Sequence, residues 1–190
     1  MLVTIVAFDE FTDIDVFLPW DLLNRVNRKD WQVKLVGTAS THTSIAGLTI
    51  PMHGDLSDVV QADAVLIASG PGTRKLMKDE DFLAKLQIDP ERQLIASMCS
   101  GALILGAKGL LRNKQATTYP TAKKLLEQFG VEVVEKDFVN EGNVSTAAGC
   151  LAAITLTGWI IERLTDSKTR ERVIQSVQPV GAGLYFEEQE

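Results

Sequence analysis

Hydrophobic residues along this chain fall into short, nearly continuous runs that are rich in β-branched side chains. Four of these runs are LVTIVAF (2–8), WQVKLVG (31–37), AVLIAS (64–69) and QLIASM (93–98). Runs of this length and composition are typical of strands that are buried on both faces of a parallel sheet. GLTIPM (47–52) and the segment around Asn143 to Thr146 predict shorter, peripheral strands.

Between these runs, apolar residues recur at helical spacing. A helix is expected from Asp13 or Asp15 through Val26, and another after Asp79, a candidate N-cap residue. Four later segments also predict helices: GALILGAKGLL (101–111), TAKKLLEQFG (121–130), LAAITLTGWIIERL (151–164) and SKTRERVIQSV (167–177). Gly130 is expected at the C′ position that ends the second of these segments.

The alternation of strands and helices predicts an α/β fold, a three-layer sandwich with a mostly parallel central sheet. Because no linker, repeat or low-complexity block interrupts the pattern, we expect one domain over residues 1–180 and a tail over residues 181–190. The acidic end, FEEQE, is interpreted as solvated. The segment 151–164 is apolar on nearly every face, which predicts either a central buried helix or a subunit interface, and so a homodimer is expected.

Composition narrows the classes of function. The formal charge is −6 and the basic residues are scattered, so no nucleic-acid partner is expected. No apolar run reaches the roughly 18–20 residues of a membrane span, and the N-terminus lacks the basic region of a signal peptide. Two cysteines without a CxxC motif favour a reducing, cytoplasmic setting. His42 and His53 lack metal-ligand spacing, so turn or solvent roles are expected for them, with no metal and no cofactor.

Cys99 is the main candidate for chemistry. It directly follows the buried run 93–98 and precedes Ser100, Gly101 and a predicted helix. A side chain at such a turn is presented at the rim of the sheet, as in a nucleophile elbow. The start of a helix favours a thiolate, which predicts a reactive cysteine with a lowered pKa. A buried, inert cysteine is the alternative.

Two further segments are expected at the same rim. The loop SGPG (69–72) follows another buried strand, and Gly70 and Gly72 are candidates to offer N–H groups as an oxyanion hole, although a plain turn is equally consistent. Asp13 and Asp15 precede an apolar helix, where either one is a candidate N-cap. Asp15 is the better candidate for a carboxyl group that donates a hydrogen bond to sulfur or positions a water molecule.

Together these motifs resemble the ThiJ/PfpI superfamily, also called the DJ-one superfamily, over nearly the whole chain. The resemblance rests on DIDVFLPWDLL, GLTIPM, SGPG, MCSGALILGAKGLL, the TTYP segment and the late helix after TAAG. It implies a class I glutamine-amidotransferase-like, flavodoxin-like architecture.

Within that superfamily the chain is most similar to isonitrile hydratases. The resemblance implies that Cys99 is the nucleophile, that Asp15 is its carboxyl partner, that Gly70 supplies an N–H group, and that Ser100 stands in place of a threonine. The implied reaction hydrates R–N≡C to an N-substituted formamide through a thioimidate on Cys99, with Asp15 as acid and base.

The departures from the superfamily limit other activities. Ser100 stands where protease-like members have a histidine, and Tyr119 stands where many relatives have one. A Cys–His–acid triad and peptide hydrolysis are therefore disfavoured. Ser69 replaces a glycine of the usual loop, and Ala147 and Ala148 occupy a turn that is usually rich in glycine.

Three other residues have more than one interpretation. Trp20 is a candidate wall of the pocket, but a core position is the more common role for such a residue. Tyr119 is a candidate hydroxyl at the rim or a packed aromatic. Cys150 is interpreted as a small buried residue at the start of a helix.

Four functions remain open at this point. The first is a cysteine-dependent enzyme acting on a small molecule, of the hydratase type. The second is an oxidant or stress sensor based on Cys99, and the third is glyoxalase-like or deglycase-like activity. The fourth, a ligand-sensing module, is disfavoured because no helix-turn-helix segment is present in the chain.

Overall fold

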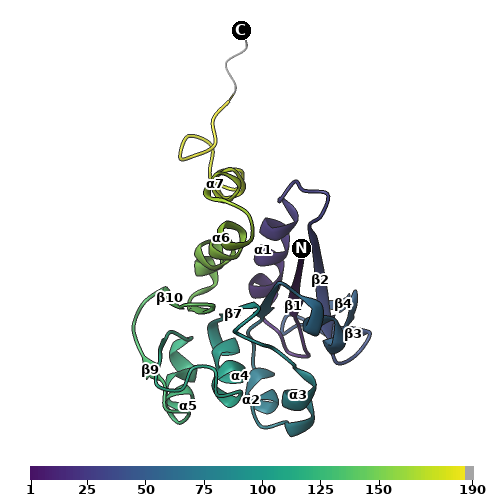
Figure 1. Ribbon diagram of the computed structural model, residues 1–190, viewed down its shortest axis with the longest axis vertical. Helices are drawn as coiled ribbons and strands as arrows, with labels where there is room; N and C mark the ends of the chain where they lie inside the picture. Colours follow the sequence, from purple (N-terminus) through teal and green to yellow (C-terminus); the bar gives the residue numbers. More distant parts are fainter. Residues whose placement is uncertain (187–190) are drawn as a thin grey trace.

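The computed structural model describes residues 1–186, and its centre is a seven-stranded sheet (Figure 1). The strands lie in the order β10-β11-β7-β6-β1-β2-β5, and every neighbouring pair is parallel except β10 with β11. Their bounds are β1 Leu2–Val6, β2 Gln32–Gly37, β5 Gly54–Asp55, β6 Ala64–Ile67, β7 Leu94–Met98, β10 Phe138–Glu141 and β11 Val144–Ala147.

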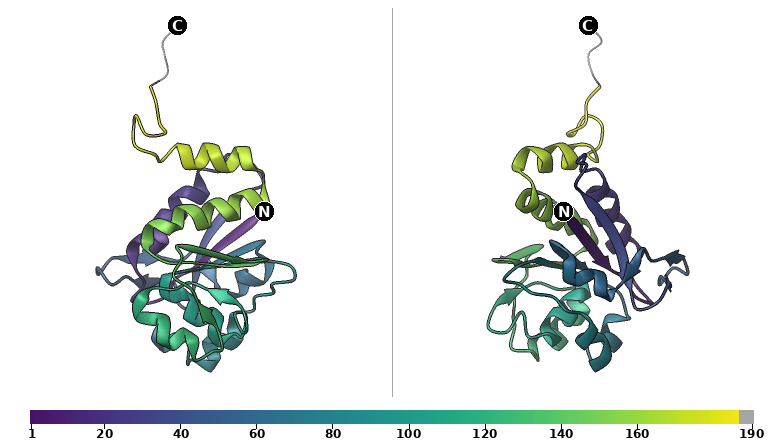
Figure 2. Two further views of the ribbon diagram at one scale, coloured as in Figure 1. Left: turned by 90° about the vertical axis from the view of Figure 1, so that its left-hand side faces the viewer. Right: turned by 45° about the vertical axis from the view of Figure 1, so that its right-hand side comes forward.

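Helices cover both faces of this sheet, which makes the three layers that the sequence predicted (Figures 1 and 2). On one face lie α1 Asp13–Asn24, α6 Ala153–Leu164 and α7 Ser167–Gln175. On the other lie α2 Thr73–Leu76, α3 Glu80–Lys85, α4 Ala102–Ala107 and α5 Lys123–Glu127. The smaller elements are the hairpin β3 Thr41–Thr43 with β4 Thr49–Pro51, the pair β8 Gln115–Ala116 with β9 Glu132–Val133, and the 3₁₀ turns η1 Leu56–Gln61, η2 Cys99–Gly101, η3 Pro120–Ala122 and η4 Cys150–Ala152.

The central strands carry apolar residues on both faces because helices cover both faces. Every residue of β6 and β7 is buried. In a parallel sheet the carboxyl ends of neighbouring strands meet at one edge. The segments that follow β1, β6, β7 and β11 therefore converge, and they bring residues 8–12, 69–72, 99–101 and 148–150 to the same rim.

Several local predictions are confirmed. The Asp79 side chain accepts a hydrogen bond from the Phe82 N–H group and so caps α3. Gly130 has a φ of 74°, the left-handed conformation that ends a helix.

Neither Asp13 nor Asp15 is an N-cap, because α1 is preceded by Thr12, whose side chain makes no capping hydrogen bond.

Some predictions of position and extent were wrong, and α1 and α5 are also shorter than predicted. The strand β11 is short but not peripheral, because it pairs with β7 on one side and β10 on the other, and all four of its residues are buried. The helix expected over residues 101–111 is α4, which ends at Ala107 because Gly109 adopts a φ of 76°.

The C-terminal part lies against the α1 side of the sheet. The helix α6 is packed between α1, α7 and the sheet, as a central helix would be (Figure 2). A subunit interface on this face stays a prediction. Residues 181–186 are largely exposed, and Glu187 to Glu190, most of the predicted acidic tail, lie outside the described residues. Within residues 1–186, no helix is long and apolar enough to cross a membrane.

Replacing Leu66→Ala tests the position of the central core. Leu66 lies in the middle of β6 and is 0% exposed, so its loss leaves a cavity that the surrounding layers cannot fill. We expect a loss of about 2–5 kcal/mol in the free energy of unfolding, measured by urea titration. The control Leu151→Ala, at a side chain that is 72% exposed, is expected to change it by no more than about 0.5 kcal/mol. Equal losses in the two variants would contradict the layer arrangement.

Candidate active site

Cys99 lies at the sharp turn between β7 and α4. Its φ is 44°, an unusual conformation for a residue with a side chain, and the residue is only 3% exposed. The turn is held tightly. A Cβ atom on Gly101 would lie 2.6 Å from the carbonyl oxygen of Ala68, and Thr118 Oγ1 donates a 2.9 Å hydrogen bond to the Cys99 carbonyl oxygen. The sequence prediction of an elbow therefore describes the backbone correctly.

Asp15 approaches the same point from α1. It lies in the first turn of the helix, on the side that faces the sheet, and is completely buried. Ser69 Oγ donates a 2.5 Å hydrogen bond to Asp15 Oδ2. Within the described part of the chain, Asp15 Oδ1 has no hydrogen-bond partner. One carboxylate oxygen is thus fixed, and the other is available to a reacting group.

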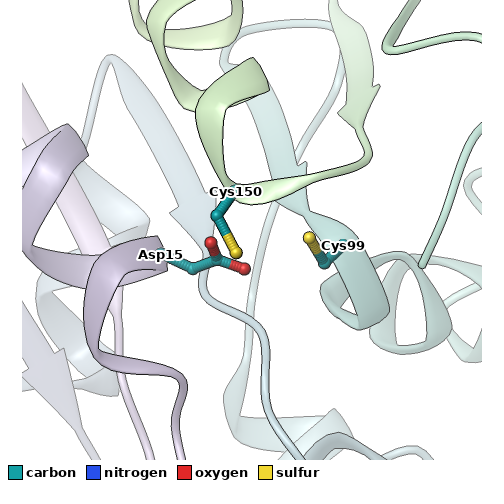
Figure 3. A group of neighbouring side chains, drawn as sticks. All are labelled: Asp15, Cys99 and Cys150. Carbon is teal, nitrogen blue, oxygen red and sulfur yellow. The ribbon is translucent and has the colours of Figure 1, made fainter.

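Cys150 is the third member of the cluster. It opens η4, directly before α6, and is half-buried. The Sγ atoms of Cys99 and Cys150 and a carboxylate oxygen of Asp15 all lie within 4.8 Å of one another, and the three side chains point toward a common centre (Figure 3).

The sequence interpretation of Cys150 as a merely buried residue missed this contact. The signal was the position of Cys150 just beyond the end of β11, since Cys99 directly follows the neighbouring parallel strand β7. Ser69 was noted only as a departure from a glycine, yet its hydroxyl holds Asp15 in place.

The electrostatics of the cluster contradict the prediction that the pKa of Cys99 is lowered. Burial raises the pKa of the Cys99 thiol well above its usual range, and the Asp15 carboxylate raises it further, while the Gly149 N–H group acts in the opposite direction. Burial, together with the nearby Asp15 side chain, also raises the pKa of Cys150 to about 11. These effects favour the thiol form of Cys99 over the thiolate. The short turn at the start of α4 does not outweigh burial beside a carboxylate.

The loop after β6 contributes its shape as well as its polar groups. Gly70 has a φ of 143°, and a Cβ atom there would lie 2.1 Å from the carbonyl oxygen of Glu10, so only glycine fits. Its N–H group donates to Ser100 Oγ at 3.1 Å, so the predicted oxyanion donor is engaged by Ser100 in this state. At Gly72 a Cβ atom would meet the carbonyl oxygen of Asp9 at 2.2 Å, and this residue fits the loop against the β1 end without lining the cavity.

A cavity of about 480 Å³ opens beside the cluster. Residues from six segments line it: Thr12, Asp15, Ile45, Ser69, Gly70, Pro71, Arg74, Ser100, Tyr119, Thr121 and Cys150. Tyr119 is 47% exposed and lies at the rim. Arg74 donates a 2.9 Å hydrogen bond to Thr121 Oγ1. This volume accommodates a small organic substrate.

Trp20 does not line this cavity. Its ring stacks on His53, with the ring centroids 5.0 Å apart and the planes 5° from parallel. The alternative interpretation of Trp20, as part of the packed structure, is therefore the better description.

The two histidines have the local roles expected from the sequence. His42 Nε2 accepts hydrogen bonds from the N–H groups of Thr38 and Ala39. His53 Nδ1 accepts one from the N–H group of Leu35. Both histidines therefore have backbone partners away from Cys99.

The cluster also bears on the prediction of no metal site. In residues 1–186, Asp15, Cys99 and Cys150 form the one group of three side chains whose ligand atoms converge as a metal would require. Two thiols and a carboxylate are a donor set that Zn²⁺ accepts. The sequence prediction considered only histidine spacing and did not include this group.

Replacing Asp15→Asn is expected to make Cys99 more nucleophilic toward a simple alkylating agent. The substitution removes a negative charge that raises the pKa of the thiol, so more thiolate is present at a given pH. At pH 8 the thiolate fraction of Cys99 rises by about tenfold for each unit by which its pKa falls, and we expect its alkylation rate with iodoacetamide to rise by about threefold for each unit, because a less basic thiolate is a weaker nucleophile. The measurement follows the tryptic peptide of residues 93–108 by mass spectrometry.

The control is Asp13→Asn, which removes the same charge from the same turn of α1 at a side chain outside the cluster. Its alkylation rate should match that of the unmodified chain. A slower reaction in Asp15→Asn would mean that the carboxylate activates the resting thiol.

Comparison with known proteins places this arrangement in a family. The DJ-1/PfpI family model matches residues 1–163. The isonitrile hydratase of Pseudomonas putida is 30% identical over 168 residues, which cover 87% of this chain and 73% of that protein. A deglycase of Pyrococcus horikoshii is 24% identical over 144 residues, which cover 75% of this chain and 87% of that protein.

Solved structures agree with this placement. A ThiJ/PfpI family protein from Pseudomonas syringae superposes with a TM-score of 0.84 at 25% identity, covering 94% of this chain and 76% of that one. DJ-1 of Schizosaccharomyces pombe shares the fold with a TM-score of 0.81 at 19% identity, covering 95% of this chain and all of its own. This chain belongs to the DJ-1/PfpI family.

Proposed function

We propose that this chain is a cysteine-dependent enzyme that hydrates an isonitrile to an N-substituted formamide. The observation that carries the proposal is the position of the buried Asp15 carboxylate. It lies within 4.8 Å of the Cys99 sulfur, with one oxygen free of protein partners, at the wall of a small-molecule cavity. The 30% identical relative that is named an isonitrile hydratase supports the choice of substrate class.

The first step forms a covalent intermediate. Because the resting Cys99 is a thiol, it needs a base at the moment of attack. Asp15 Oδ1 accepts the thiol proton as the sulfur bonds to the terminal carbon of R–N≡C. The same proton is then delivered to that carbon, which gives the thioimidate R–N=CH–S–Cys99. Ser69 keeps the carboxylate oriented through Oδ2 during this transfer.

The second step consumes water. Asp15 accepts a proton from a water molecule as its oxygen adds to the thioimidate carbon, and the nitrogen is protonated. Collapse of the adduct expels the Cys99 sulfur, which recovers its proton, and releases R–NH–CHO. The overall reaction adds one water molecule to R–N≡C and gives R–NH–CHO, and it requires no oxidant, reductant or metal.

The distribution of histidines separates this reaction from amide hydrolysis. A protease of the cysteine class protonates a leaving amine with an imidazolium ion. Both histidines of this chain have other partners, at Thr38 and Leu35. Hydration of an isonitrile has no leaving amine, so a single carboxyl group meets its proton requirements.

Cyclohexyl isocyanide provides a direct assay, with formation of N-cyclohexylformamide followed by chromatography. We expect turnover by the unmodified chain and none by Cys99→Ser, because the alcohol is a far weaker nucleophile here. Asp15→Asn should lower kcat by about 10²–10⁴-fold, the usual contribution of a general acid–base group. The same variant is expected to alkylate faster, so a loss of turnover there cannot be attributed to a less reactive thiol.

Asp13→Asn is again the matched control and should retain activity. No turnover with several isonitriles of different size, by a folded chain with a free Cys99, would refute the proposal. Consumption of methylglyoxal in the same preparation would instead favour the second candidate, a deglycase-like or glyoxalase-like activity, which relatives at 24% and 22% identity carry in their names.

A further inference from the structure

The hydration mechanism leaves Cys150 without a task. Its sulfur lies within 4.8 Å of the Cys99 sulfur, and a disulfide bond is about 2.05 Å long. The two sulfur atoms therefore need to approach by no more than about 2.8 Å to form this bond.

The two cysteines differ in their freedom to move. Cys99 is fixed by its tight turn, by the Thr118 hydrogen bond and by the packing of Gly101 against the β6 end. Cys150 follows Gly149, which has a φ of 86° and no atom within 4 Å of its Cβ position. Leu151, the next residue, is exposed. The movement that brings the two sulfur atoms together is therefore expected in the segment 149–151.

Access to the pair is provided by the same cavity. Asp15 and Cys150 both line it, and both have an atom within 4.8 Å of the Cys99 sulfur. A molecule as small as hydrogen peroxide that enters the cavity is therefore brought close to both thiols.

We propose that Cys150 is a resolving thiol, which converts peroxide-oxidised Cys99 into an intramolecular Cys99–Cys150 disulfide. The proposal is independent of the substrate that Cys99 otherwise attacks.

The atoms balance in two steps. Cys99–SH and H₂O₂ give Cys99–SOH and water, as the sulfur takes one oxygen and the O–O bond breaks. Cys150–SH then attacks that sulfur, the S–S bond forms, the S–O bond breaks, and a second water leaves. Asp15 Oδ1 accepts the Cys150 proton and passes it to the departing hydroxyl group. A dithiol reductant reverses the oxidation by exchange and becomes a cyclic disulfide.

This reaction has a chemical consequence for Cys99. Without a nearby thiol, a sulfenic acid reacts with further peroxide to sulfinic acid, which ordinary thiols do not reduce. With Cys150 in reach, oxidation stops at a state that a dithiol restores. The pair therefore reduces one peroxide for each dithiol consumed and preserves the nucleophile.

The experiment treats the chain with hydrogen peroxide in a buffer that contains a chelator, so that no bound metal covers the thiols. Remaining thiols are then blocked with N-ethylmaleimide and the chain is digested with trypsin without reduction. Cys99 lies in the peptide of residues 93–108 and Cys150 in the peptide of residues 137–163. We expect these two peptides joined, with the loss of two hydrogen atoms, and separated again by dithiothreitol.

The variant Cys150→Ser provides the comparison. We expect its Cys99 to gain two oxygen atoms under the same treatment, and dithiothreitol to leave them in place, whereas both thiols of the unmodified chain are recovered. Circular dichroism before treatment shows whether the variant is folded. The intact mass distinguishes a bond within one chain from a bond between two.

One result in the unmodified chain would overturn the proposal without any variant. This result is Cys99 carried to the sulfinic acid with no joined peptide, while Cys150 is still fully blocked by N-ethylmaleimide. Equal rates of sulfinic acid formation in the chain with and without Cys150 would overturn it as well. Neither result bears on isonitrile turnover, so failure here and failure of the proposed function are distinguishable.

Discussion

The parallel pairing of β1, β6, β7 and β11 is the constraint on which the site depends. It forces four chain segments that are distant in sequence to leave the sheet at one edge. The segment after β1 leads into α1 and carries Asp15, and the segment after β6 is the loop with Ser69 and Gly70. The segment after β7 is the Cys99 turn, and the segment after β11 carries Cys150. If any of these pairings were antiparallel, its polar group would be on the opposite side of the molecule, and no cluster would form.

Much of the central sheet, and the edge at which the site lies, could be predicted from the sequence, because local patterns of apolar residues indicate which segments are strands and that they run parallel. Continuous apolar runs indicated buried parallel strands, and the small residues after Cys99 indicated a sharp turn into a helix. Those two facts placed Cys99 at the rim of the sheet and made Asp15 and the SGPG loop candidates for the same rim, and the family resemblance favoured Asp15 as the partner of Cys99. The short strand β11 was assigned to the periphery because its four residues are too few to show a period, although pairing on both sides buries all of them.

The protonation state of the thiol could not be predicted in the same way. A helix start after a cysteine favours the anion, and that rule is local. Burial and the approach of Asp15 depend on how α1 packs across the sheet, and they act in the opposite direction and dominate. The partnership of Ser69 with Asp15 and the position of Cys150 likewise arise from contacts between segments more than fifty residues apart or on different strands.

The tight turn at Cys99 sets the position of the sulfur atom separately from the shape of the cavity. Backbone packing of Gly101 against the end of β6 sets where the sulfur lies, and no residue of the outer cavity wall takes part in that packing. Ile45, Arg74 and Tyr119 form much of the wall and come from other segments. Substitutions in this wall can therefore change which small molecules the cavity admits, while the Cys99 sulfur stays in the same place.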